Sequence, residues 1–161
     1  RLGGLAIHGG LIFGLGAAAI LCVIWKIRPL NAMDLAAPCI AIAQSIGRWG
    51  NYFNSEAHGG PTDLPWGVEI NGMTYHPTFL YESIWCFMLF FFLIYVDNRR
   101  KFEGQTILLY GILYSVERFF VEGLRTDSLM IGPFRQAQLL SLTVIIICTA
   151  FYLILRKKMS R

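Results

Sequence analysis

The sequence predicts an all-α integral membrane protein with about five transmembrane helices, built as a single membrane-embedded domain over residues 1–161. Composition is the first reason. Hydrophobic residues make up 55% of the 161-residue chain and charged residues only 15%, with a mean hydropathy of +0.53. A typical soluble domain carries about 25% charged residues. The second reason is that long apolar stretches recur along the chain, separated by short polar segments.

The first two apolar stretches cover residues 2–25 and 30–47. About 20 apolar residues are needed to cross about 30 Å of hydrocarbon. Residues 2–25 meet this requirement and contain one ionisable residue, His8. Residues 30–47 are less apolar and contain Asp34, which lies near the start of the stretch. We therefore expect each stretch to form a spanning helix.

The other three stretches cover residues 77–96, 104–121 and 138–155. The first of them contains Glu82 as its one ionisable residue, and the last contains none. The middle stretch is interrupted only by an adjacent glutamate and arginine near its end. All three are long enough to span a bilayer.

Basic residues predict the orientation of these spans. They form three groups, after the first, third and fifth stretches, and alternating spans bring all three groups to one side. The positive-inside rule makes this side cytoplasmic, so residues 51–75, which include the polar insert 61–75, are expected outside. The net charge of +4 is then mostly a topology signal and does not indicate nucleic-acid binding. The groups are Lys26 and Arg28; Arg99, Arg100 and Lys101; and Arg156, Lys157, Lys158 and Arg161.

The cations expected on the outer side are all arginines, whereas every lysine falls on the cytoplasmic side. Guanidinium presents a planar fork of donors that matches phosphate and carboxylate better than an ammonium does. General solvation would not separate the two residue types in this way. The outer arginines therefore predict a phosphate or carboxylate site, and they are Arg1, Arg48, Arg118, Arg125 and Arg135.

The run at residues 47–60 is the most informative segment. It places Arg48, Asn51, Asn54 and Glu56 among glycines and aromatic residues, directly after an apolar approach. A charged residue at membrane depth is costly and is usually functional. The run predicts a site for a phospholipid headgroup at the edge of a bilayer, and the alternative is a polar loop between two helices.

Other predicted spans also carry polar residues at their outer ends. His8 lies near the outer end of the first span, where helix–helix hydrogen bonding explains it as well as catalysis does. His76 opens the third span. Tyr114, Arg118 and Glu122 are spaced i, i+4 and i+8 on one helical face, with an intrahelical Arg118–Glu122 pair as the alternative. Side chains from four spans are thus expected to converge: His8, Arg48, Asn51, Glu56, His76, Tyr114, Arg118 and Glu122.

The cysteines do not indicate chemistry. All four lie inside apolar stretches without CxxC spacing, which favours buried apolar thiols. A catalytic thiol needs an electropositive, accessible setting. No cluster of histidine, cysteine and carboxylate residues has metal-ligand spacing, so we expect no metal. The cysteines are Cys22, Cys39, Cys86 and Cys148.

Four motifs in order resemble the prolipoprotein diacylglyceryl transferase family, and the resemblance covers the whole chain. The Gly-Arg-x-Gly-Asn string at residues 47–51, with Asn54 and Glu56, is highly specific, whereas the others are individually weak. The match begins partway into the family pattern. Because the chain also starts at Arg1 and opens almost directly into a span, we expect it to be N-terminally truncated. The other motifs are His-Gly-Gly-Leu at 8–11, His-Pro-Thr-x-Leu-Tyr-Glu at 76–82, and Tyr114-x3-Arg118-x3-Glu122-x2-Arg125.

The resemblance implies a multi-pass enzyme of the bacterial plasma membrane, with its active site towards the extracytoplasmic face. Such enzymes move the diacylglyceryl group of phosphatidylglycerol to the lipobox cysteine thiol in a prolipoprotein signal peptide. The products are a thioether and glycerol 1-phosphate, and no metal or cofactor is required. Partners are therefore membrane lipid, phosphatidylglycerol and prolipoprotein.

The residue types fit this chemistry. A thiolate is the nucleophile, so a base such as His8 must take or relay its proton, with His76 and His58 as competitors. Arg48 and Arg118 suit the negative charge that grows on the departing phosphate. The residues expected to bind substrate are Asn51, Asn54, Glu56, His76, Tyr114, Glu122 and Arg125.

Two other classes of function remain open. A polytopic transporter or channel also gathers arginine, histidine and glutamate, but it should place them near mid-membrane along a path. Another phospholipid-headgroup transferase, or a non-catalytic lipid-binding scaffold, would share the phosphate-binding arginines without needing a thiol base.

Overall fold

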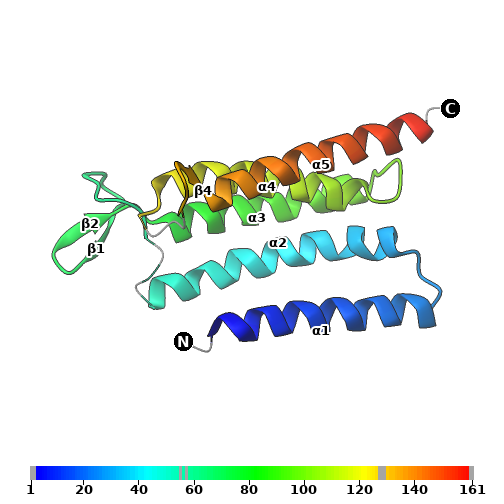
Figure 1. Cartoon of the computed structure of the whole chain (residues 1–161), viewed down its shortest axis with the longest axis horizontal. Helices are drawn as coiled ribbons and strands as arrows, with labels where there is room; N and C mark the ends of the chain where they lie inside the picture. The colour runs from blue at the N-terminus through cyan, green and yellow to red at the C-terminus, as the bar shows by residue number, and fades with distance from the viewer. Residues whose placement is uncertain (1–2, 55, 57, 127–129, 160–161) are drawn as a thin grey trace.

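The computed structural model describes residues 3–54, 56, 58–126 and 130–159, without the side chains of residues 3–12, 15 and 131. Over these ranges the chain forms five helices that run back and forth along one long axis (Figure 1). They confirm the predicted helical class. The helices are α1 (Gly3–Ile24), α2 (Pro29–Phe53), α3 (Thr78–Asp97), α4 (Gln105–Leu124) and α5 (Gln136–Met159).

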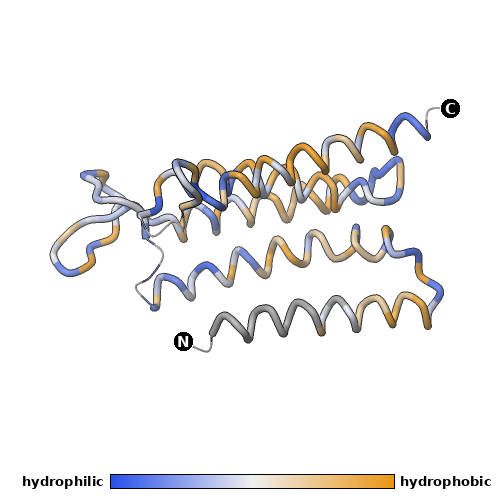
Figure 2. Tube along the Cα trace, in the orientation of Figure 1, coloured by the Kyte–Doolittle hydropathy of each residue, from blue (hydrophilic) through white to orange (hydrophobic). Residues whose placement is uncertain are grey.

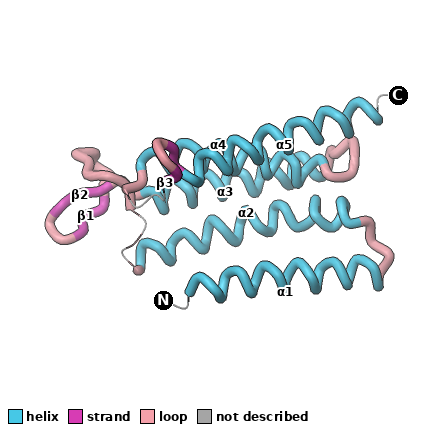
Figure 3. The backbone as a smooth tube through the Cα atoms, viewed as in Figure 1, coloured by secondary structure: helices cyan, strands magenta, loops and turns pink. Residues whose placement is uncertain are grey.

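Two short antiparallel hairpins lie at the same end of the bundle (Figure 3), which we call the hairpin end. The first pairs β1 (Val68–Ile70) with β2 (Met73–Tyr75), inside the predicted polar insert. Its turn residues Asn71 and Gly72 both have positive φ, 53° and 80°, as a tight two-residue hairpin requires. The second pairs β3 (Met130–Ile131) with β4 (Phe134–Arg135). These strands are a small addition to the all-α prediction.

Small residues let α2 and α3 approach closely. Ala37 and Ala41 of α2 are fully buried one turn apart, and they pack with Leu89 and Leu93 of α3. Small residues at i and i+4 allow close contact between helix backbones in membrane proteins. Helix α4 packs beside this pair, and α5 packs along α4 (Figure 1).

Many large apolar side chains are exposed on the helices, and the trace coloured by hydropathy shows long apolar stretches along them (Figure 2). Phe91 of α3 is 57% exposed and Ile146 of α5 is 68% exposed, which is unusual in a soluble domain unless the surface meets a partner or a membrane. Among the described residues, α3 and α5 are long and apolar enough to cross a membrane. The number of five spans stays a prediction.

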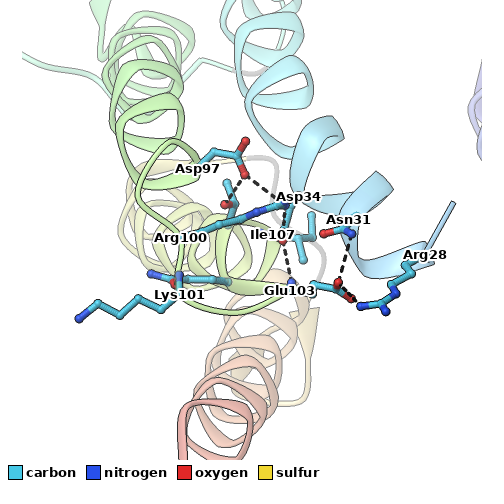
Figure 4. A network of polar contacts seen from close by, with 11 residues as sticks. Arg28, Asn31, Asp34, Asp97, Arg100, Lys101, Glu103 and Ile107 are labelled. Carbon is cyan, nitrogen blue, oxygen red and sulfur yellow. Dashed lines mark hydrogen bonds and ion pairs between the residues drawn. The ribbon is translucent and has the colours of Figure 1, made fainter. Parts of the chain in front are cut away.

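The end opposite the hairpins is organised by Asp34, a residue of α2 with no exposed surface. Its carboxylate accepts hydrogen bonds from the backbone N–H groups of Gly104 (2.7 Å) and Ile107 (2.9 Å), at the start of α4. Arg100 also donates to it, at 3.2 Å (Figure 4). Asp34 therefore caps α4 from a neighbouring helix, and its negative charge is favourable at a helix N-terminus.

Helix α2 extends beyond the apolar stretch that predicted the second span. The stretch ends at Gly47, with a polar run after it, whereas α2 continues to Phe53. The alternative of a polar loop therefore does not hold for Arg48 and Asn51, which lie in the helix. The last turns persist because side chains there bond to other helices, as with Trp49 and Ser83 (Nε1–Oγ 3.2 Å).

Candidate active site

Four charged side chains from three helices meet near the hairpin end. Glu82 of α3, 1% exposed, lies between two guanidinium groups: Arg48 of α2 contacts its Oε2 at 2.6 Å, and Arg118 of α4 contacts its Oε1 at 3.2 Å. Arg118 also pairs with Glu122 at 3.0 Å, one turn along α4. We call these four residues the arginine cluster. A carboxylate shared in this way fixes both guanidinium groups next to one another.

A hydrogen bond to an aromatic side chain orients Arg48. Its Nη2 donates to the hydroxyl of Tyr114 at 3.1 Å. The Tyr114 ring stacks on Tyr110, with centroids 5.6 Å apart, and Tyr110 donates to Gln44 of α2 at 2.9 Å. The face of α4 that carries the two tyrosines is thereby held against α2.

A pair of serines holds α2 against α3 just inside the cluster. The hydroxyl of Ser45 donates to the carbonyl of Ser83 at 2.8 Å, and that of Ser83 donates to the carbonyl of Ser45 at 2.9 Å. Small hydroxyl residues allow helices in a membrane to approach and bond across the interface. Because Ser45 precedes Arg48 by one helical turn, this contact sets the distance from Arg48 to Glu82.

The arginine cluster combines balanced charge with access from solvent. Two guanidinium groups and two carboxylates cancel in formal charge. The side chains of Arg48 and Arg118 remain 20% and 19% exposed. Each guanidinium carries five N–H donors, and the ion pairs and the bond to Tyr114 use only some of them. The remaining donors can bind an anion that has several oxygens.

A second group of predicted residues lines a cavity of about 290 Å³ between the end of α2, the start of α3 and β1. In it, Nδ1 of His76 lies 3.4 Å from the hydroxyl of Tyr81, and the ring of His58 packs on Tyr75 with centroids 4.5 Å apart. We call this cavity the loop pocket. Its polar lining residues are Asn51, Glu56, His58, Glu69 and His76.

Backbone pairing attaches the loop pocket to the end of α4. The N–H of Gly59 donates to the carbonyl of His76 at 2.9 Å, and the N–H of Gly60 donates to the carbonyl of Leu124 at 2.9 Å. A Cβ at Gly59 would lie 2.6 Å from the Cβ of His76, so this approach requires glycine. Arg135 closes the same corner, because its Nη1 donates to the backbone carbonyls of Glu122 and Arg125.

The predicted site residues thus fall into two neighbouring groups rather than one. Arg48, Tyr114, Arg118 and Glu122 meet around Glu82, whereas Asn51, Glu56 and His76 line the loop pocket.

The remaining predicted residues lie outside these two groups or at their edges. Asn54 caps the end of α2, and its amide donates to Glu56 at 3.3 Å. Arg125 follows α4 and forms a bridge with Gly59. His8 belongs to α1, but its side chain lies outside the described residues.

The sequence did not assign a role to Glu82, although it marked it as the one ionisable residue of its span. The cost of a buried charge was the available signal, and the residue's two arginine partners come from α2 and α4. Glu117 was noted only as an interruption of the fourth span, and it is 6% exposed beside the cluster. Among the described residues, no three histidine, cysteine or acidic side chains form a group that could hold a metal ion.

Comparison with known proteins identifies the family of this chain. The family model described as prolipoprotein diacylglyceryl transferase matches residues 1–154. The chain belongs to the prolipoprotein diacylglyceryl transferase family. The match includes every motif around the arginine cluster and the loop pocket, and the predicted resemblance is confirmed.

Individual relatives in this family are similar over most of the chain. A phosphatidylglycerol–prolipoprotein diacylglyceryl transferase of Clostridioides difficile is 55% identical over 146 residues, which cover 91% of this chain and 59% of the relative. The enzyme of that name from Finegoldia magna is 52% identical, over 91% of this chain and 59% of its own length. That from Clostridium kluyveri is 48% identical, over 100% of this chain and 67% of its own length. The chain therefore spans about three-fifths to two-thirds of the length of these relatives.

Proposed function

We propose that this protein transfers the diacylglyceryl group of phosphatidylglycerol to the lipobox cysteine thiol of a prolipoprotein. The reaction forms a thioether and releases glycerol 1-phosphate. The family membership supports the reaction class, and the names of the relatives support the two substrates. The observation that carries the proposal is that Arg48 and Arg118, from different helices, are both fixed on one buried carboxylate, Glu82.

In this proposal the arginine cluster binds the phosphate of the lipid. Glu82 holds the two guanidinium groups in place before the lipid arrives, and their unused N–H donors face the anion. Donors that are fixed in advance stabilise developing charge without reorganising during the reaction. The hydroxyl of Tyr114, held by Arg48 at 3.1 Å, can donate a further hydrogen bond to a phosphate oxygen.

The chemical step is a substitution at carbon. The thiolate sulfur attacks the glyceryl carbon that carries the phosphate, the carbon–oxygen bond breaks, and its electrons stay on the leaving phosphate oxygen. The thiol must lose its proton first, since the thiolate is the nucleophile. His8 takes or relays this proton, with His76 and His58 as competing candidates.

The loop pocket suits the glycerol headgroup beside the phosphate. Its amide, carboxylate and imidazole groups can exchange hydrogen bonds with hydroxyl groups, and it begins one helical turn beyond Arg48, at Asn51. In the proposal Asn51 and Glu56 hold the headgroup, while Asn54 orients Glu56. No metal or organic cofactor takes part.

We further propose that the chain is a multi-pass protein of the bacterial plasma membrane, with the hairpin end outside. Among the described residues, the basic groups other than the outer arginines fall at the end of the bundle opposite the hairpins (Figure 1), in agreement with the positive-inside rule. Labelling single cysteines in intact cells tests this orientation. Asp63→Cys should react with an impermeant reagent and Arg100→Cys should not, and the reverse pattern would overturn it.

Incubation of the purified chain with headgroup-labelled phosphatidylglycerol and a lipobox peptide tests the function. The expected result is thioether formation on the peptide with an equal amount of labelled glycerol phosphate released. A peptide whose cysteine is replaced by serine is the control and should not react. Release of glycerol phosphate without a thioether would indicate another headgroup transferase. Binding of lipid without turnover would indicate a scaffold.

A further inference from the structure

Within the described part of the chain, Glu117 is a buried carboxylate without a hydrogen-bonding partner. It lies in α4, is 6% exposed, and neither of its oxygens has a partner among the described residues. Both carboxylates of the arginine cluster, in contrast, are paired with guanidinium groups. Buried polar groups are nearly always bonded, so an orphaned pair of acceptors needs an explanation.

The position of Glu117 connects it to the cluster. It precedes Arg118 in α4 and follows Tyr114 by three residues, which places it on the helix face that packs on α2 and α3. The charged groups that act on it are Glu82 of α3, Arg118 of its own helix and Arg48 of α2.

Other ionisable groups complete these surroundings. The thiol of Cys86, on α3, interacts electrostatically with Glu117. On α4, Tyr114 lies one turn before it and Glu122 lies beyond Arg118. Helix α5 presents Cys148 against Gly111 of α4, and among the described residues it adds no ion pair to the cluster.

Charge balance shows when Glu117 can be ionised. The arginine cluster is neutral by itself, so ionised Glu117 brings the site to one net negative charge. An unpaired buried charge is tolerated only near a compensating one, and here the compensation comes from Arg48 and Arg118. A phosphate on these guanidinium groups competes with Glu117 for the same compensation, most strongly when it carries two charges.

We propose that Glu117 holds the proton that the thiol loses during transfer. This inference rests on the proposed function. As sulfur attacks carbon and the carbon–oxygen bond breaks, one negative charge moves to the leaving phosphate, and the thiol proton moves to Glu117. The phosphate changes from a monoanion to a dianion while Glu117 changes from an anion to a neutral acid, so the site keeps its net charge.

The other described bases are less well placed for this role. His58 and His76 lie in the loop pocket, engaged with Tyr75 and Tyr81. Glu82 and Glu122 already hold guanidinium groups. Glu117 is thus the carboxylate of this region with both acceptors available, and His8, if it takes part, relays the proton towards it.

The proposal can be tested without turnover by measuring how many protons the protein takes up when it binds the product glycerol 1-phosphate. Calorimetric titration of the purified chain with glycerol 1-phosphate, in two buffers of different ionisation enthalpy, measures the protons taken up per ligand. Mildly alkaline pH keeps the free ligand a dianion. The unsubstituted chain should take up about one proton, and its affinity should fall as pH rises.

The variant Glu117→Gln keeps the shape of the side chain but cannot ionise. It should bind glycerol 1-phosphate with no proton uptake and with an affinity that is independent of pH over the same range. Glu117→Met should behave in the same way, and it replaces the first variant if that one does not fold. Glu103→Gln, the same change at the opposite end of the bundle, should keep the proton uptake.

Three results overturn the inference, and they distinguish its failure from that of the proposed function. If the unsubstituted chain binds glycerol 1-phosphate without proton uptake, or if Glu117→Gln keeps the uptake, Glu117 does not hold the proton although the phosphate site stands. If the chain does not bind glycerol 1-phosphate at all, the proposed function fails together with the inference. In the transfer assay Glu117→Gln should be slower by about a hundredfold, and Glu117→Asp should recover part of the rate.

Discussion

The two ends of the bundle each bury an aspartate or glutamate, but they differ in how many hydrogen-bonding groups around that carboxylate are already paired. Asp34 accepts from two backbone N–H groups and from Arg100, so both of its oxygens are bonded within the protein (Figure 4). At the hairpin end, Glu82 holds two arginines that still have unused donors, and Glu117 has no partner among the described residues. A carboxylate whose oxygens are both bonded within the protein can only stabilise the fold. A site whose N–H donors and carboxylate oxygens are partly unbonded can still bind a ligand.

The same contrast extends to the arginines. Arg28 pairs with Glu103 at 2.6 Å, but its side chain is 76% exposed, and such exposed pairs contribute little. Arg48 and Arg118 are about four-fifths buried and share one carboxylate. Charge is therefore concentrated in a region of low dielectric at the hairpin end, where it acts most strongly on a bound anion.

Removal of an arginine from the cluster should have the largest effect on activity. Arg48→Ala and Arg118→Ala should each lower the transfer rate by about a hundredfold or more, equivalent to about 3 kcal/mol of lost transition-state stabilisation. Steady-state assays on folded protein measure this. Near-normal turnover of both variants would show that the cluster is not the active site.

Removal of the Asp34 carboxylate should act on stability instead. Asp34→Ala leaves two buried N–H groups at the start of α4 without acceptors and takes a partner from Arg100. We expect a loss of about 3 kcal/mol in the free energy of unfolding, with little change in the rate per folded molecule. Denaturant unfolding in mild detergent measures it, and Asp63→Ala, in an exposed loop, is the control. An unchanged midpoint would contradict the capping role.

The histidines should differ in their effect on rate. His8→Gln keeps hydrogen bonding but loses basicity, and it should slow transfer by about a hundredfold and flatten the rise of rate with pH. His58→Gln should retain most of the activity, because its ring packs on Tyr75 in the loop pocket. If His58→Gln loses activity and His8→Gln does not, the loop histidine, and not His8, takes or relays the proton.

The smallest effect is expected at the exposed ion pair. Glu103→Gln removes the partner of Arg28, and it should change the free energy of unfolding by less than about 0.5 kcal/mol. The same unfolding experiment measures it. A loss as large as that of Asp34→Ala would mean that the surface pair also helps to hold the start of α4.

The order of the helices and the residues at each end could be predicted, because hydropathy and basic residues are properties of single stretches of chain. The end of α2 could not, since the turns after Gly47 are stabilised by Glu82, Ser83 and Tyr114 from other helices. The ion pairs of Glu82 and the proposed role of Glu117 could not be predicted from the sequence for the same reason. Each depends on which side chains of α2 and α4 lie opposite, and spacing within one helix does not reveal that.

The separation of the loop pocket from the arginine cluster could not be predicted from the sequence either. It results from the backbone pairing of Gly59 with His76 and of Gly60 with Leu124, which joins segments distant in sequence. The glycines at 59 and 60 end the run at residues 47–60, but the run does not indicate which residues they pair with.

One matched pair of variants tests most directly the claim that the hairpin end performs the reaction and the Asp34 end supports the fold. Arg48→Lys and Arg100→Lys make the same change at opposite ends, and both are measured in the transfer assay, normalised to folded protein. We predict that Arg48→Lys loses about a hundredfold in rate, because an ammonium cannot replace the forked donors on phosphate, while Arg100→Lys stays within about twofold. Equal rates for the two variants, or a larger loss at Arg100, would contradict the account.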